Sequence, residues 1–104
     1  MKTLNDYQGA EGIDKLLECA PYINELISDK ETMQNIEEKS WIQLGGELYK
    51  AHTETCNALF RALDHEPENA ISAISATAQV MAELLTNKDL IDFFISLRKE
   101  KSKM

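Results

Sequence analysis

The chain has 104 residues, which is enough for one domain with a single modest core, and its 43% hydrophobic content argues against intrinsic disorder. A formal net charge of −7, from 11 basic and 18 acidic residues, disfavours nucleic-acid binding, because an acidic surface repels phosphates. No window approaches 18 consecutive apolar residues and no signal peptide is apparent, so we expect a cytoplasmic protein that neither spans nor binds a membrane.

The chain divides into three parts by composition. Residues 1–10 have no clear periodicity and are predicted to be a flexible leader. Residues 11–97 carry helical patterns throughout and form a single helical domain. Residues 98–104 hold four basic residues against one acidic residue and are predicted to be a basic frayed tail, whose cations suit a helix C-terminus.

The first helical pattern begins at Glu11, and its apolar residues are Ile13, Leu16, Leu17, Ala20, Ile23, Leu26 and Ile27. Pro21 lies inside it and disfavours a straight helix, so the pattern is either one bent helix or two short helices. The run Ser28-Asp29-Lys30-Glu31 has capping-box spacing and predicts a short helix over residues 30–38.

The longest helical pattern covers residues 41–63, and Ser40 is its predicted cap. Its apolar stripe is Trp41, Leu44, Leu48, His52, Thr55, Leu59 and Leu63, broadened by Cys56 and Phe60. Gly45 and Gly46 should each weaken a helix by about 1 kcal/mol relative to alanine. We favour the interpretation that they allow close approach of another helix, without breaking this one.

A turn follows at residues 64–67, and Pro67 suits the first position of the next helix. The predicted buried stripe of that helix is Ile71, Ile74, Ala78, Met81 and Leu85. Asn87 should cap a last helix with Leu90, Ile91, Phe94 and Leu97 on one face. Because no strand pattern is present, the expected fold is all-α, a compact bundle of four to six short helices joined by tight turns.

The sequence offers little for catalysis or metal binding. His52 and Cys56 are four residues apart and would share a helix face, but a zinc site would need further ligands, for which only Cys19 and His65 remain. No phosphate-binding loop is present, and no oxyanion hole accompanies either cysteine. We therefore expect buried free thiols, no metal or other cofactor, and no enzymatic activity.

Aromatic and aliphatic side chains are the better candidates for function. Adjacent helical residues diverge by about 100°, so Phe93 and Phe94 cannot both face the core. Phe94 shares the apolar stripe of the last helix, whereas Phe93 is the candidate for an exposed aromatic that binds a partner. The predicted partner-binding residues are Phe93, Trp41, Ile95 and Leu97.

Three segments together resemble the tail assembly chaperones of long-tailed phages and prophages of Gram-positive bacteria. These are the run from Ala20 to Asp29, the run from Leu48 to Leu63, and the helix end from Glu83 to Leu90 followed by Asp92-Phe93-Phe94. The likeness covers about residues 13–96 and consists of apolar spacing with a terminal Phe-Phe.

This resemblance implies a small helical protein of the host cytoplasm that is absent from the mature virion. Its partner would be the tape measure protein, whose apolar helical stripes it shields until the tail tube assembles, and it would be able to form homo-oligomers. The alternative from the residues is a small acidic helical adaptor or inhibitor that masks a basic surface through carboxylates, namely Glu31, Glu37, Glu38, Glu47 and Glu54. Binding by such an adaptor should weaken steeply with salt.

Overall fold

The computed structural model describes Leu4 and residues 9–103, without the side chains of Glu11 and residues 98–103. This part of the chain is helical and contains no strand. The elements are α1 (Gly9–Ile27), α2 (Lys30–Met33), the 3-10 helix η2 (Ile36–Glu38), α3 (Trp41–Ala51), α4 (Thr53–Ala62), α5 (Ala70–Thr86) and α6 (Lys88–Lys103). The predicted all-α bundle is confirmed.

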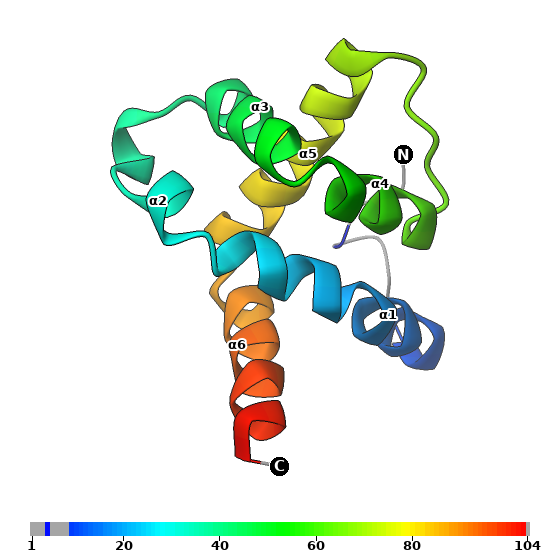
Figure 1. The fold of residues 1–104 in the computed structure, drawn as a ribbon. Helices are drawn as coiled ribbons and strands as arrows, with labels where there is room; N and C mark the ends of the chain where they lie inside the picture. Colours follow the sequence, from blue (N-terminus) through cyan, green and yellow to red (C-terminus); the bar gives the residue numbers. More distant parts are fainter. Residues whose placement is uncertain (1–3, 5–8, 104) are drawn as a thin grey trace.

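The helices pack in two groups that share one core. Helix α3 crosses α5, while α1 packs against α4 and α6 (Figure 1). Helix α5 also contacts α6, which joins the two groups, and the last turns of α6 point away from the body. The radius of gyration is 13.1 Å, close to the value of about 13 Å for a compact domain of 100 residues.

The core takes side chains from all five long helices. Its largest members, all less than 2% exposed, are Leu4, Ile23, Leu26, Leu44, Leu48, Leu59, Phe60, Leu63, Val80, Met81, Leu84 and Phe94. Leu4 is also held by its backbone N–H, which donates to Glu83 Oε2 at 3.0 Å. The other residues of the predicted leader, up to residue 8, lie outside the described residues. In the predicted tail the α6 backbone is helical to Lys103, and the side chains of residues 98–103 lie outside the description.

Helix α1 is a single helix, so the bent-helix alternative describes it better than two separate helices. Pro21 lies inside it with its ring exposed to solvent. Because proline has no N–H, the carbonyl four residues earlier lacks its helical partner. The first and last turns of α1 point in different directions (Figure 1).

The helix predicted over residues 30–38 was wrong. Its cap is Asp29, whose carboxylate accepts the N–H of Thr32 at 3.0 Å, and α2 ends after one turn. Gln34 is then extended and Asn35 adopts left-handed backbone with φ of 56°, so only η2 follows. With no buried residue in α2 or η2, packing does not extend this segment into a longer helix.

The single helix predicted over residues 41–63 was also wrong, because it breaks at His52, whose φ and ψ are −132° and 49°. At 1.5 Å per residue, an unbroken helix of this length would be about 35 Å long. The longest dimension of the whole molecule is 34 Å. The break lets α3 pack on α5 and α4 pack on α1. Ser40 caps α3 as predicted, since its hydroxyl accepts the N–H of Gln43 at 3.0 Å.

The predicted role of the glycine pair is confirmed at one of its two positions. A Cβ placed on Gly45 would lie 2.7 Å from the carbonyl oxygen of Ile74 and 2.8 Å from the backbone nitrogen of Ala78. Only glycine therefore permits this crossing of α3 and α5. At Gly46 the nearest atom to such a Cβ would be Ile74 Cγ2 at 3.9 Å, which is an ordinary contact.

The start and the buried face of α5 differ from the prediction. The helix begins at Ala70, three residues after Pro67, because Asn69 caps it by accepting the N–H of Ser72 at 2.9 Å. Ile71 was expected in the core but is 77% exposed. Close approach of α3 turns the small residues inward, and the buried set is Ala73, Ala76, Thr77, Ala78, Val80, Met81 and Leu84. Asn87 caps α6 as predicted, accepting the N–H of Asp89 at 3.1 Å.

Candidate partner-binding site

An apolar groove of about 270 Å³ lies between the end of α1, the segment with α2 and η2, the end of α5, and α6. All six side chains that line it are aliphatic and half-buried: Ile27, Met33, Ile36, Leu85, Ile91 and Ile95. Five of them also pack against the core, and Ile95 is the exception. Because its lining is aliphatic, the groove suits aliphatic side chains of a partner.

The irregular segment after α1 forms one wall of this groove. Because α2 and η2 are short, Met33 and Ile36 are the only large apolar side chains they supply, and both line the groove. Lys39 fastens the segment, since its Nζ donates to Thr32 O at 2.7 Å and to Glu47 Oε2 at 2.8 Å. The wall is therefore anchored to α3 by a charged hydrogen bond.

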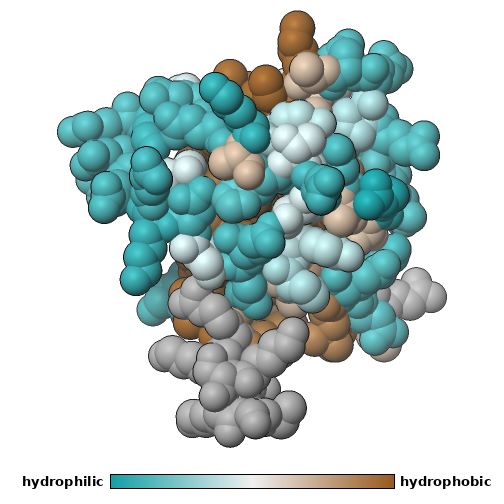
Figure 2. All heavy atoms as spheres, in the orientation of Figure 1, coloured by the Kyte–Doolittle hydropathy of each residue, from teal (hydrophilic) through white to brown (hydrophobic). Residues whose placement is uncertain are grey.

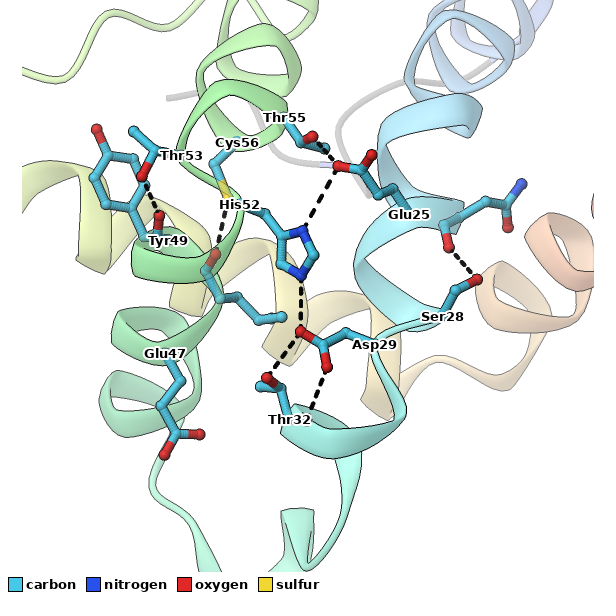
Figure 3. A network of polar contacts seen from close by, with 12 residues as sticks. Glu25, Ser28, Asp29, Thr32, Glu47, Tyr49, His52, Thr53, Thr55 and Cys56 are labelled. Carbon is cyan, nitrogen blue, oxygen red and sulfur yellow. Dashed lines mark hydrogen bonds and ion pairs between the residues drawn. The ribbon is translucent and has the colours of Figure 1, made fainter.

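A second anchor connects the start of this wall to the break between α3 and α4 (Figure 3). His52 Nε2 lies 2.7 Å from Asp29 Oδ2, and a carboxylate can only accept, so this ring nitrogen carries the proton. The Thr32 N–H and His52 hold the pKa of Asp29 at about 2, well below its usual value. Glu25 lies on the other side of the ring, with Oε2 3.7 Å from His52 Nδ1, and accepts the Thr55 hydroxyl.

The structure brings only one of the predicted partner-binding residues into the groove. Ile95 lines it, but Leu97 is half-buried and packs against the core. Phe93, expected as an exposed aromatic, is also half-buried and packs against the core, with its ring 5.2 Å from that of Phe94 in an edge-to-face contact. Trp41 is 41% exposed on a different part of the surface, at the start of α3.

The other five groove residues were recognised from the sequence only as members of helical stripes. Ile27, Leu85 and Ile91 belonged to three different predicted helices, and Met33 and Ile36 to the misassigned helix over residues 30–38. The signal that could have identified one wall of the groove was the pair of apolar residues, Met33 and Ile36, in the otherwise polar and charged segment of residues 30–38. Periodicity does not reveal which helix ends meet, so the groove could not be assembled from it.

The residues considered for catalysis or metal binding are either buried in the core or held by contacts within the fold. Cys19 and Cys56 are free and fully buried, and burial raises the pKa of each thiol to about 11. Both thiols are therefore protonated at neutral pH, the unreactive form. His52 is held by Asp29, and His65 packs edge-to-face on Phe60 with ring centres 5.8 Å apart. The described residues contain no group of three or more side chains placed to hold a metal ion.

Comparison with known proteins found no matching family model, no similar curated protein and no similar solved structure. Among the described helices, none combines the length and the apolar character needed to cross a membrane.

Proposed function

We propose that this protein is a phage tail assembly chaperone that binds and shields the helical tape measure protein in the cytoplasm of the bacterial host. The observation that carries the proposal is the apolar groove beside α6. A groove lined by six aliphatic side chains can receive the apolar stripe of an amphipathic helix, which is one of the recurring modes of peptide recognition.

The size of the groove suits reversible shielding. Burial of one isoleucine or leucine from a partner contributes about 1.5–3 kcal/mol, and association itself costs several kcal/mol in lost freedom. One groove of this size therefore holds a partner helix weakly. A long partner with repeated stripes would be covered by many copies of the chain, each of which can leave when the tail tube assembles.

The charge of the chain supports the same function. The net charge of −7 keeps a complex with an apolar partner soluble, because the coated surfaces repel one another. Chemistry at a cofactor is not needed for this role. The protein would act by covering apolar surface and would be absent from the finished virion.

The test is binding of helical segments of the tape measure protein encoded in the same genome, measured by fluorescence anisotropy. The informative variant is Ile95→Glu, because Ile95 lines the groove without packing against the core, so the change should not unfold the protein. The matched control is Ser96→Glu, an exposed neighbour on the same helix that receives the same charge. We expect Ile95→Glu to weaken binding at least about tenfold, the equivalent of one lost apolar contact, and the control to leave it unchanged.

Two results would contradict the proposal. One is the absence of binding to any tape measure segment by a folded wild-type protein. The other is equal binding by wild type and Ile95→Glu, which would place the interaction outside the groove. Affinity should also persist at high salt, because apolar contacts are not screened.

Steep loss of affinity with salt would favour the second candidate, an acidic adaptor that masks a basic surface. Glu31, Glu37 and Glu38 are exposed around α2 and η2, as such a role requires. Glu47 is less suitable than the sequence indicated, because Lys39 already binds its carboxylate and lowers its pKa.

A further inference from the structure

The wall of the groove, which comprises residues 29–39, is attached to the molecule by few of its side chains. None of these residues is buried, and more than half are exposed. Figure 2 shows a mainly hydrophilic surface on the side of the molecule where Figure 1 places α2. The half-buried residues are those that make contacts: Asp29, Thr32, Met33, Ile36 and Lys39. A segment with so little buried surface has low local stability.

The backbone hydrogen bonds of α2 and η2 stay within the wall. Four N–H groups donate to carbonyl oxygens three or four residues earlier, at 2.9–3.1 Å, and they belong to Met33, Gln34, Glu38 and Lys39. Between the two turns the regular backbone is interrupted, because Gln34 is extended and Asn35 is left-handed. Single helical turns are not stable in isolation, so these turns should melt once the wall loses its contacts. The four amides therefore report whether the wall is in place.

Two side-chain contacts fasten the ends of the wall to neighbouring helices. At its start, Asp29 Oδ2 lies 2.7 Å from Nε2 of His52, the residue that separates α3 from α4 (Figure 3). At its end, Lys39 Nζ donates to Glu47 Oε2 on α3 at 2.8 Å. Water reaches both pairs, since the four side chains are between 15% and 41% exposed. Contacts of this kind contribute less to stability than fully buried ones.

The inner side of the wall supplies Met33 and Ile36 to the groove. The other four lining residues belong to α1, α5 and α6, which are 19, 17 and 16 residues long. These long helices contribute fully buried side chains to the core, whereas the wall packs on it through two half-buried ones. The groove therefore has firm sides on the long helices and one side that can move away.

We propose that the wall opens as a unit while the core stays folded, and that this opening is the gate through which a partner helix enters and leaves the groove. Elements that bind ligands are commonly drawn from the parts of a protein that open at low local free energy. The gate rests on the groove being the binding site, as in the proposed function. The opening itself is a property of the free protein, so it can be tested without a partner.

The first test is amide hydrogen exchange of the full chain by NMR, in urea concentrations below the unfolding transition. The amides of Met33, Gln34, Glu38 and Lys39 should exchange at least about a hundredfold faster than the amides in the buried half of α5. Their exchange should be nearly independent of urea, because opening of the wall exposes little surface. Exchange at the same rate as the core, with the same urea dependence, would overturn the proposal.

Two substitutions separate opening of the wall from unfolding of the core. Lys39→Met keeps the unbranched stem but removes the charged hydrogen bonds, and should speed exchange of the wall about tenfold. Its control is Lys50→Met, the same change at an exposed residue of α3, which should leave the wall unchanged. Leu59→Ala, in the core on α4, should speed exchange of the core at least about thirtyfold. It should leave the wall unchanged, because Leu59 stays packed when the wall opens; equal acceleration of wall and core would contradict a separate opening.

The second test repeats both measurements with a bound helical segment of the tape measure protein. The segment should slow exchange of the four wall amides, and it should dissociate about tenfold faster from Lys39→Met than from wild type or Lys50→Met. Unchanged wall exchange in the complex, or equal dissociation rates, would overturn the gate while leaving the proposed function intact. Failure of every segment to bind would remove the proposed function and the gate together, and would leave the opening of the free wall to the first test.

Discussion

The close crossing of α3 and α5 makes a strong prediction about Gly45. In Gly45→Ala the new Cβ would lie 2.7 Å from Ile74 O, 2.8 Å from Ala78 N and 2.9 Å from Ala78 Cβ. Two of these are backbone atoms, so a side-chain rotation cannot relieve the contact and the helices must separate. Overpacking of this kind costs about 1–3 kcal/mol, and three contacts under 3 Å place Gly45→Ala near the upper end.

The matched variant is Gly46→Ala, which makes the same chemical change one residue later. Alanine is favoured over glycine in a helix by about 1 kcal/mol, and this gain applies to both variants. At Gly46 no close contact offsets this gain, since the new Cβ would lie 3.9 Å from its nearest neighbour, Ile74 Cγ2. Gly46→Ala should therefore be more stable than wild type by up to about 1 kcal/mol, and Gly45→Ala less stable by about 2 kcal/mol.

Urea and thermal unfolding followed by circular dichroism will measure these differences. For a domain of this size 1 kcal/mol corresponds to about 4–8 °C in Tm, so Gly45→Ala should melt at least about 8 °C below wild type. Equal stability of the two alanine variants would refute the reasoning. It would mean that α3 and α5 do not approach closely at Gly45.

Two further perturbations probe the wall of the groove and the core beneath it. Asp29→Ala removes the cap of α2 and the partner of His52, and should lower the free energy of unfolding by about 1–2 kcal/mol at pH 7. The folded pKa of Asp29, about 2, is below the unfolded value, so this contribution is present above about pH 4 and lost as pH falls toward 2. Urea titrations across that range will test it, and a difference from wild type that is independent of pH would contradict it. Phe94→Ala should cost about 3–5 kcal/mol, because Phe94 is fully buried, and Phe93→Ala roughly half as much, because Phe93 is half-buried. The same unfolding assay compares them, and an equal cost would show that the two rings are equally buried.

Local signals in the sequence were sufficient for the all-α fold class and for several helix ends. Ser40 and Asn87 act as caps because their side-chain oxygens accept backbone N–H groups within the next three residues. Periodic apolar residues placed Leu44, Leu48, Leu59 and Phe94 in the core correctly. These features depend on interactions within a few residues of the chain, which is why they can be read in order along it.

Tertiary packing decided what the sequence left undetermined. The helix over residues 41–63 breaks at His52 because its halves pack on α5 and α1, which lie in different directions. Close approach at Gly45 turned the alanines of α5 inward and left Ile71 exposed. The groove depends on the meeting of two stretches that are distant in sequence, residues 27–36 and residues 85–95. By itself the sequence determined an acidic all-α chain and the caps Ser40 and Asn87. Only packing between distant helices decided which apolar residues remain at the surface to bind a partner, because burial depends on contacts that no local pattern records.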